Sequence, residues 1–329
     1  MAPKPDAATL PDIRDKRLVF LIGAPRSGTT WLQILLSSSP AVATFTETHL
    51  FSTYTASLFA GWRTFENSPD PVGLKMMMSK EEFLGLVREI TSAVMSRILM
   101  TRPTASVILE KTPFHACCCP DILAVYPDAY FLHIVRDPRA VVASMRAARQ
   151  WGGSGWASPW LADNCEFWRK CVEEARAMRA ATSRYLEIRY EDLVDNGIPT
   201  LRQVFRWMEI DEPEPECARI LEANRIDNLR NQSGDGTSDF VRRLRELYGG
   251  GGTSGFFRRG EVDGWRQDLT PRQVQLIERM TGKIAVELGY EPTPNAAFDA
   301  NRVIVACMLA AERIRSGLKW RVKRLVDAR

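Results

Sequence analysis

A segment near the N-terminus, from Leu18 to Trp31, places the strongest constraint on the fold. The apolar run Leu18–Ile22 predicts a short buried strand, a glycine- and proline-containing turn follows, and an amphipathic run from Trp31 to Ser38 predicts a helix. The backbone amides of such a turn and the positive end of the helix dipole can together bind a phosphate group. The segment therefore predicts an α/β fold with a phosphate-binding loop between a strand and a helix.

The turn differs from the nucleotide-binding P-loop at one position. The spacing Gly23-x-x-x-x-Gly28-Thr29-Thr30 is close to that of the P-loop, which carries lysine after its second glycine. Here Thr29 takes the place of the lysine, and the cation lies three residues earlier, at Arg26. A Walker-type lysine contacts the β- and γ-phosphates, whereas Arg26 would stand at the mouth of the loop and reach a transferred group beyond a 5′-phosphate. An ordinary P-loop NTPase and an incidental turn before a core helix are the alternatives.

The composition indicates a globular protein with a mildly basic balance. Of the 329 residues, 45% are apolar and 26% are charged, and the formal net charge is +4. This charge suits a polyanionic nucleotide but is too small to indicate nucleic-acid binding. The seven cysteines include the consecutive Cys117–Cys119 but no CxxC pair with metal-binding spacing. We therefore expect reduced thiols, no metal site and a cytoplasmic location, and the sequence gives the triplet no specific role.

The chain is expected to consist of a tail, one main domain and a terminal helix. Residues 1–16 are polar, lack the apolar core of a signal peptide and are interpreted as a mobile tail. No uncharged run is long enough to span a bilayer. Residues 17–290 form the main domain in this interpretation, and residues 291–329 form a basic amphipathic helix.

Apolar runs that alternate with helical patterns predict a parallel sheet. Strands are expected at 18–22, 41–45, 106–109, 130–135 and 184–189. Helices are expected at 79–98, 116–125, from 138, at 161–181, 199–209, 214–224, 270–288 and 298–326, with loops at 60–78 and 225–255. This alternation is typical of a three-layer α/β fold with a central, mostly parallel sheet. Ligands bind such sheets at the carboxyl ends of the strands, where polar motifs follow Ile22, Leu109, Val135 and Arg189.

Two helix starts have clear sequence signals. Ser79 and Glu82 form a capping box, and Asp137 can cap a helix that has Pro138 at its first position. The helix after Ser79 is expected to bury the apolar residues Phe83, Val87, Ile90, Val94 and Ile98.

Two of these motifs together resemble the sulfotransferases that use 3′-phosphoadenosine 5′-phosphosulfate (PAPS). The sequence Gly-x-Pro-Arg-Ser-Gly-Thr-Thr-Trp, ending at Trp31, resembles the family's 5′-phosphosulfate loop. Arg136 and Ser144 are similar in placement and spacing to an arginine and a serine that bind the 3′-phosphate of PAPS. The resemblance covers most of residues 17–290 and implies transfer of a sulfuryl group from PAPS to a hydroxyl. It implies PAPS contacts by Arg26, Ser27, Gly28, Thr29, Thr30 and Trp31.

A third segment, residues 257–265, resembles the family motif Arg-Lys-Gly-x-x-Gly-Asp-Trp. Arg259 stands at the lysine position, and Asp263-Gly264 inverts the Gly-Asp of the motif. The resemblance implies that Arg258, Arg259 and Gly260 also contact the 3′-phosphate, a task that suits the planar fork of arginine.

Two aromatic residues match positions that contact adenine in the family. Tyr190, in the sequence Tyr-Glu-Asp-Leu, matches one contact, and Trp31 matches a residue that stacks on the base. For both residues, packing in the core is the alternative interpretation.

The base for the acceptor hydroxyl is where the sequence departs from many cytosolic sulfotransferases. Those enzymes carry Lys-Thr-His with histidine as the base, but proline occupies that place here, at Pro113. The arrangement of Glu47, 21 residues after Arg26, resembles tyrosylprotein and related bacterial sulfotransferases, in which a glutamate is the proposed base. His49 and His115 remain alternative bases.

Two cations are implied to stabilise the transferring sulfonate. Lys111 keeps the family's lysine position, and Arg26 lies at the mouth of the loop. With cations supplied by the protein, no metal is needed for the transfer. Either cation would lower the pKa of a neighbouring Glu47, whereas partial burial would raise it, so the sequence leaves this balance open.

The acceptor is a hydroxylated molecule whose class the sequence leaves open among sugar, lipid, phenol and peptide. Its pocket is expected to draw on residues 50–78, 151–160 and 225–255. The C-terminal basic helix has two interpretations, a docked or homo-oligomer-forming helix and a peripheral membrane contact. A P-loop small-molecule kinase and a non-catalytic nucleotide-binding scaffold are the rival functions.

Overall fold

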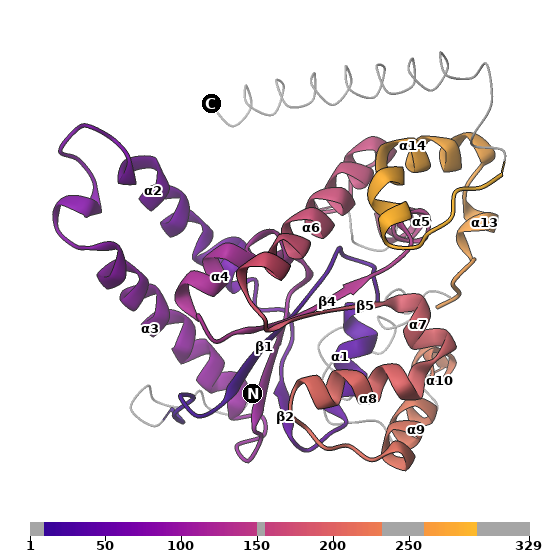
Figure 1. Cartoon of the computed structure of the whole chain (residues 1–329), viewed down its shortest axis with the longest axis horizontal. Coiled ribbons are helices and arrows are strands. Elements are labelled where there is room, and N and C mark those ends of the chain that lie inside the picture. Colours follow the sequence, from indigo (N-terminus) through magenta and orange to yellow (C-terminus); the bar gives the residue numbers. More distant parts are fainter. Residues whose placement is uncertain (1–9, 150–154, 232–259, 295–329) are drawn as a thin grey trace. The chain divides into compact units, whose positions relative to one another are not determined.

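A five-stranded, entirely parallel sheet organises the computed structural model, which describes residues 10–149, 155–231 and 260–294. The strands are β1 (Arg17–Ile22), β2 (Val42–Thr44), β3 (Val107–Lys111), β4 (Tyr130–Val135) and β5 (Tyr185–Arg189). Their order in the sheet is β2-β3-β1-β4-β5 (Figure 1). The central strand β1 is buried from Val19 to Ile22. The expected α/β fold with a mostly parallel sheet is confirmed.

The chain divides into two compact units. The first comprises Met1–Val135 and Cys171–Phe257 and carries the sheet. The second comprises Arg136–Lys170 and Arg258–Arg329. The long helix α6 (Leu161–Ala181) begins in the second unit and ends in the first.

Helices cover both faces of the sheet in the first unit. On one face, α1 (Thr29–Ser37), α8 (Gly197–Trp207) and α9 (Glu214–Ala223) share a hydrophobic core with alternate residues of the strands. On the other face lie α3 (Lys80–Leu99), η4 (Pro113–Cys117) and α4 (Cys119–Val125), and Phe20 of β1 packs there against Phe51 and Tyr126. The remaining elements are η2 (Leu50–Tyr54), α2 (Ala56–Glu66), η3 (Leu74–Met76), α7 (Tyr190–Asp195) and α10 (Ile226–Asn231).

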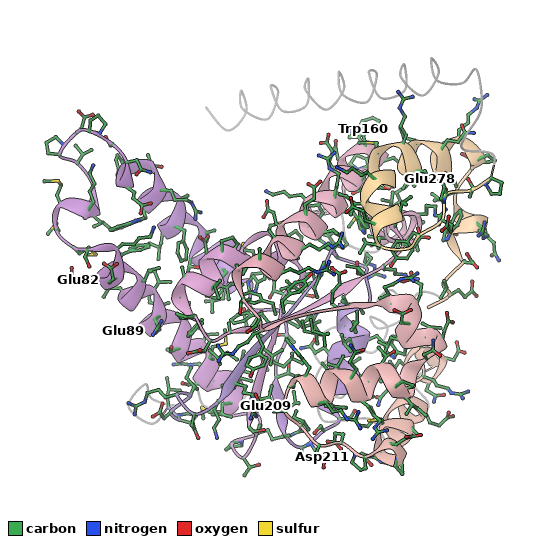
Figure 2. The ribbon with its side chains drawn as sticks, in the orientation of Figure 1. Glu82, Glu89, Trp160, Glu209, Asp211 and Glu278 are labelled. Atoms are coloured by element: carbon green, nitrogen blue, oxygen red, sulfur yellow. The ribbon has the colours of Figure 1, made fainter. Side chains whose placement is uncertain are left out.

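The second unit is built around α5 (Pro138–Ala148), α13 (Trp265–Asp268) and α14 (Pro271–Glu287). Apolar residues of these helices and of the start of α6 form its core. Asp137 caps α5 as predicted, accepting a hydrogen bond from the Arg139 amide at 2.8 Å. The other predicted cap is also confirmed, because Ser79 and Glu82 form a complete capping box at the start of α3. Glu82 is labelled in Figure 2.

Three expectations about local structure were wrong. Residues 60–78, expected to be a loop, contain most of α2 and all of η3, because Trp62 stacks on Phe83 of α3 with ring centroids 4.6 Å apart. In α3, Ile90 is 52% exposed, and Thr91 takes its place on the buried face by hydrogen bonding to Tyr126 Oη at 2.7 Å. The expected loop at 225–255 begins with the helix α10.

Several expectations lie outside the described residues. These are the tail up to residue 9, the first part of the pocket segment expected at 151–160, residues 232–255, Arg258 and Arg259, and the C-terminal helix beyond residue 294. Within the described part of the chain, no helix combines the length and apolar character needed to cross a membrane. Cys117–Cys119 lie at the junction of η4 and α4, and none of the three forms a disulfide with another described residue.

Candidate active site

The loop between β1 and α1 is shaped by two glycines that no other residue could replace without a clash. A Cβ on Gly23 would lie 2.5 Å from the carbonyl oxygen of Ile134, and a Cβ on Gly28 would lie 2.5 Å from Tyr190 Cδ2. Gly28 also has φ of 98°, in the left-handed region that favours glycine. Arg26 takes φ of 76° at the turn, an uncommon conformation for a residue with a side chain.

This loop leaves hydrogen-bonding groups available for an anion. Gly28 is the N-cap of α1 and has no side chain, so no N-cap side chain accepts a hydrogen bond from the amides of the first helical turn. Ser27 is buried, and its Oγ has no hydrogen-bond partner among the described residues. A buried hydroxyl without a partner is costly. The residues Ser27–Thr30 therefore fit a phosphate group, which would accept hydrogen bonds from the hydroxyl and the amides.

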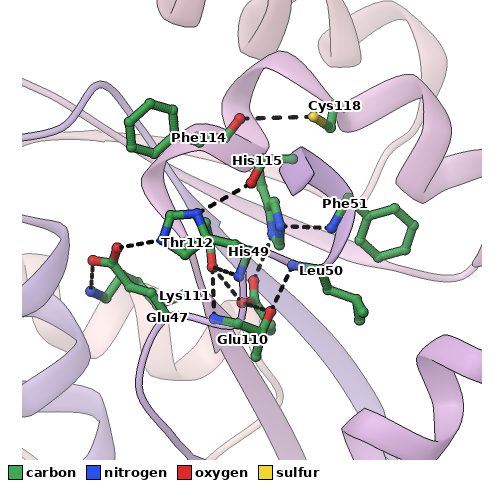
Figure 3. Close-up of polar contacts among 12 residues, drawn as sticks. Glu47, His49, Leu50, Phe51, Glu110, Lys111, Thr112, Phe114, His115 and Cys118 are labelled. Atoms are coloured by element: carbon green, nitrogen blue, oxygen red, sulfur yellow. Dashed lines mark hydrogen bonds and ion pairs between the residues drawn. The ribbon is translucent and has the colours of Figure 1, made fainter. Parts of the chain in front are cut away.

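The three side chains of Lys111, Glu47 and Thr30 meet at the carboxyl edge of the sheet. Figure 3 shows Lys111 and Glu47. Lys111 ends β3, and its Nζ donates to Glu47 Oε1 at 2.6 Å and to Thr30 Oγ1 at 3.2 Å. Glu47 follows β2, and Thr30 is in the first turn of α1. The structure thus brings together a predicted cation, a predicted base and the predicted phosphate loop, with only 4% of the Lys111 side chain exposed.

The balance of charges at Glu47 is resolved in favour of the ionised form. Burial alone would raise the pKa of Glu47, but the charge of Lys111 and the hydrogen bond from His49 outweigh it and lower the pKa to about 2. His49 Nε2 lies 3.5 Å from Glu47 Oε2, and its hydrogen bond to Glu47 raises the pKa of His49. In the protein alone, Glu47 is therefore a carboxylate held between the Lys111 ammonium and the His49 ring.

His115, one of the alternative bases, is committed to other contacts on the buried side of the site. Its Nδ1 is 2.8 Å from Glu110 Oε2, and its Nε2 accepts a hydrogen bond from the Phe51 amide at 3.0 Å. The ring is fully buried. Both ring nitrogens are occupied by protein groups, so this histidine has no nitrogen left for an acceptor hydroxyl.

Trp31 and Tyr190 both lie under the loop, packed against each other. Their ring centroids are 5.7 Å apart at 62°, and Trp31 Nε1 donates to the carbonyl of Asn224 at 3.0 Å. Tyr190 is only 2% exposed and touches the bare Cα side of Gly28. In the protein alone, these rings belong to the core that supports the loop, and their contact with adenine stays a prediction.

The second unit holds the residues predicted to bind a 3′-phosphate. Arg136 directly precedes the cap of α5, Ser144 lies on that helix, and both are half-buried. Arg136 Nη2 donates to the carbonyl of Glu261 at 2.9 Å, next to Gly260, which has φ of 71°. The structure thus brings Arg136 beside the segment that carries the third sequence motif.

Arg139 has a structural role that the sequence did not reveal. Its guanidinium pairs with Asp137 at 2.6 Å and with Glu278 of α14 at 2.7 Å. It also lies over the ring of Trp265, with Cζ 4.3 Å from the centroid. Arg139 thus joins the start of α5 to α13 and α14, whereas Arg136 contacts Glu261, in the segment before α13.

Glu110 and its partners Thr48 and Thr112 are the site residues that sequence reasoning missed. The available signal was a charged residue at the end of an otherwise apolar strand, directly before Lys111.

Within the described ranges, His, Cys, Asp and Glu side chains form no group of three or more suited to a metal ion.

Comparisons with known proteins agree with this fold and site. The model of the sulfotransferase family matches residues 19–214, more than half of the chain. The nodulation protein NoeE of Sinorhizobium fredii is 26% identical over 307 residues, which cover 87% of this chain and 69% of NoeE. A putative protein-tyrosine sulfotransferase of Caenorhabditis briggsae is 26% identical over 201 residues, covering 59% of this chain and 66% of the relative. This chain belongs to the sulfotransferase family.

A solved structure supports the same fold. Mouse sulfotransferase SULT7A1, crystallised in complex with PAP, has a TM-score of 0.50 and 13% sequence identity, covering 91% of this chain and 89% of that one. At this identity the likeness concerns the fold alone. The chain spans about two thirds of the length of the two relatives described above.

Proposed function

We propose that this protein transfers a sulfuryl group from PAPS to a hydroxyl of an acceptor, with Glu47 as the general base. The observation that carries the proposal is the position of Lys111 Nζ between Glu47 Oε1 and Thr30 Oγ1. It links the base, the cation and the phosphate loop at one point. PAP (3′-phosphoadenosine 5′-phosphate), bound in the structure of mouse SULT7A1, is the nucleotide that remains after PAPS has lost its sulfuryl group.

The residues of the first unit divide the work of the transfer. Ser27, Gly28, Thr29 and Thr30 would bind the 5′-phosphate through hydroxyls and helix-terminal amides. The acceptor oxygen forms a bond to sulfur as the bond from sulfur to the bridging phosphate oxygen breaks. Glu47 takes the acceptor proton, and the leaving oxygen keeps the electron pair of the broken bond.

Two cations would stabilise the negative charge that develops during this step. Lys111 is fixed by β3 and has its ammonium at the edge of the loop. Arg26, at the positive-φ position of the turn, would reach the sulfonate from the other side. Fixed cations that act on developing charge are commonly the largest contribution to catalysis of group transfer. Arg136, Ser144, Gly260 and the arginines at 258 and 259 would bind the 3′-phosphate.

The low pKa of Glu47 fits this scheme if the nucleotide competes for Lys111. An ionised carboxylate with a pKa of about 2 is a weak base. When the ammonium of Lys111 turns to the sulfonate, the charge that lowers the pKa of Glu47 is shared with another anion, and the pKa rises. Binding of PAPS would thus make Glu47 a stronger base at the moment it is needed.

A thermal-shift comparison tests the nucleotide. PAP is expected to raise the melting temperature at low micromolar concentration in the presence of EDTA, and ATP and ADP are expected to have little effect. Lys111→Met should reduce the effect of PAP, while Lys80→Met, at a surface ion pair on α3, serves as the matched control. Stabilisation by ATP that requires Mg²⁺, without an effect of PAP, would instead identify a kinase.

Mass spectrometry tests the transfer itself. A host extract incubated with PAPS and the protein should yield products heavier by one sulfuryl group, and Glu47→Gln should yield none above background. PAP binding without any such product across extracts would favour the nucleotide-binding scaffold.

A further inference from the structure

Four consecutive backbone amides directly after Glu47 are each bound by a side chain. The amides of Thr48 and His49 donate to Thr112 Oγ1 at 3.1 and 3.2 Å. The Leu50 amide donates to Thr48 Oγ1 at 3.2 Å, and the Phe51 amide donates to His115 Nε2 at 3.0 Å. The amides of Leu50 and Phe51 are the first two of the helical turn η2, and His49 is its N-cap. The first amides of a helix have no partner within the helix.

The three side chains that bind these amides all converge on Glu110 (Figure 3). The hydroxyls of Thr48 and Thr112 both donate to Glu110 Oε1 at 2.7 Å, and His115 Nδ1 lies 2.8 Å from Oε2. Glu110 itself is 2% exposed. The carboxylate of buried Glu110 therefore accepts a hydrogen bond from each of the three side chains that bind the backbone amides of residues 48–51.

The directions of these hydrogen bonds require an ionised carboxylate. Because the Phe51 amide donates to His115 Nε2, the ring proton must be on Nδ1, which then donates to Glu110. Glu110 thus accepts three hydrogen bonds and donates none. Burial would raise the pKa of Glu110, but the His115 ring and the two threonine hydroxyls outweigh it, so that the pKa lies below its usual value.

The network reaches both proposed reacting groups through neighbouring residues. Glu110 directly precedes Lys111 in β3, and Thr48 directly follows Glu47. The segment between them includes His49, which has φ of 52°, a conformation that the surroundings must hold in place. Glu47, after β2, and Lys111, at the end of β3, are 64 residues apart in sequence, and this network is a direct polar link between the two segments.

We infer that Glu110 is a positioning residue for the reaction, which fixes the Glu47 segment against the end of β3 and so holds the Glu47 carboxylate on Lys111. This inference rests on the proposed function, in which Glu47 and Lys111 act on the substrates. It also gives His115 a role in this network. His115 supports the segment of the base from the buried side, through the Phe51 amide.

The chemistry of the network gives Glu110→Gln a specific effect. If the amide nitrogen of glutamine faces His115, two N–H donors meet, and the ring must move its proton to Nε2. The Phe51 amide then loses its acceptor. If the nitrogen faces the threonines, their hydroxyls lose the acceptor shared at Oε1. Either orientation releases part of the segment from residue 48 to residue 51.

The test follows the titration of Glu47 by NMR with ¹³C-labelled glutamate side chains, in the full-length chain without nucleotide. The signal of Glu47 is identified by its absence in Glu47→Gln. In the wild type it should keep its ionised position down to about pH 3, because the pKa of Glu47 is held at about 2. Glu110→Gln and Thr112→Val should raise this pKa by about one unit or more, as contact with Lys111 and His49 is lost.

Two matched variants separate positioning from general loosening of the fold. Thr112→Ser keeps the hydroxyl and should preserve the wild-type titration. Glu187→Gln disturbs a second glutamate–histidine pair of the same sheet, where buried His133 has its Nδ1 3.3 Å from Oε2 of partly buried Glu187, and should also preserve it. An unchanged Glu47 titration in folded Thr112→Val would overturn the inference, as would an equal shift in Glu187→Gln.

The readout also keeps this inference separate from the proposed function. Titration of Glu47 requires neither PAPS nor an acceptor. Failure of PAP to stabilise the protein would reject the proposed function while the titration still measured whether Glu110 positions Glu47.

Discussion

Lys111 Nζ lies 2.6 Å from Glu47 Oε1, yet the two side chains differ in their access to solvent, with 4% of Lys111 and 27% of Glu47 exposed. The ammonium depends on this carboxylate and on Thr30 for its hydrogen bonds, because water hardly reaches it. The carboxylate has His49 and solvent as further partners. The pair is therefore asymmetric, and removing one partner is not equivalent to removing the other.

We predict that Glu47→Gln destabilises the protein more than Lys111→Met. The first change leaves a buried ammonium without its counter-ion, which should lower the free energy of unfolding by about 2 to 3 kcal/mol after allowance for the partial exposure of Glu47. The second change removes the buried charge itself and should cost about 1 kcal/mol or less. Urea unfolding at pH 6 measures both. A larger loss in Lys111→Met would contradict this account of the pair.

The stabilisation by Glu47 should disappear in acid. The pKa of Glu47 is about 2 in the folded protein, whereas a glutamate without these partners, as in the unfolded chain, has a pKa of 4.5. The folded state therefore binds the proton less readily than the unfolded state. The contribution is complete above about pH 4.5 and is lost as the pH falls toward 2. The difference in unfolding free energy between wild type and Glu47→Gln should thus be constant at pH 5 to 6 and shrink by pH 3. A difference that stays constant down to pH 3 would place the carboxylate outside this ion pair.

Kinetics can distinguish Glu47 from His49 as the base. Once an acceptor has been identified, Glu47→Gln should lower kcat by about 10² to 10⁴ with PAP affinity largely kept. His49→Asn should lower kcat by no more than about tenfold, since His49 only adjusts the charge on Glu47. Asparagine is the suitable replacement because it tolerates the φ of 52° at this position. The opposite order of effects would make the histidine the base.

Much of the fold was predictable because its signals are local. The strand Tyr130–Val135 and the helix Leu161–Ala181 have the bounds expected from their apolar patterns. Caps at Ser79 and Asp137 mark helix starts through contacts within three residues. The rule that parallel strands present their ends at one edge was also sufficient to bring the loop, Glu47 and Lys111 together.

The remaining features depend on contacts between distant segments. Residues 56–66 form a helix in which Trp62 finds Phe83, and Thr91 rather than Ile90 is buried because Tyr126 offers a hydroxyl. The pKa of Glu47 depends on burial and on the distances to Lys111 and His49, which the sequence does not contain. Likewise, Glu110 has no motif of its own, and its role follows only from the three side chains that converge on it.

Two arginines three residues apart are predicted to have separate roles in the second unit. Arg139→Ala removes one partner of the buried group formed with Asp137 and Glu278 and should lower the free energy of unfolding by roughly 3 to 5 kcal/mol. Arg136→Ala removes a hydrogen bond to the Glu261 carbonyl and leaves the pairs of Arg139 with Asp137 and Glu278 intact, so it should be less destabilising. Arg136→Ala should instead weaken PAP binding by about tenfold or more, the effect of one charged contact to phosphate. Calorimetry on both variants, at a temperature where both are folded, would refute the assignment if PAP affinity fell equally.

The glycine at the start of α1 offers the most direct test of the phosphate loop. In Gly28→Ala, the new methyl group would lie 2.5 Å from Tyr190 Cδ2 at a residue with φ of 98°. Strain and overpacking together should cost roughly 2 to 4 kcal/mol. Because Tyr190 is buried in the core, relief of the clash must displace the loop, so PAP affinity should fall as well. Gly61→Ala is the matched control.

Gly61 lies within α2, and a Cβ there would meet no atom within 4 Å. Alanine at this position should stabilise the helix by about 0.5 to 1 kcal/mol and leave PAP binding unchanged. The same chemical change is thus expected to have opposite effects on stability at the two positions. If Gly28→Ala kept both its stability and its PAP affinity, Tyr190 would not determine the shape of this loop. The fit of Ser27–Thr30 to a phosphate would then lose its structural basis.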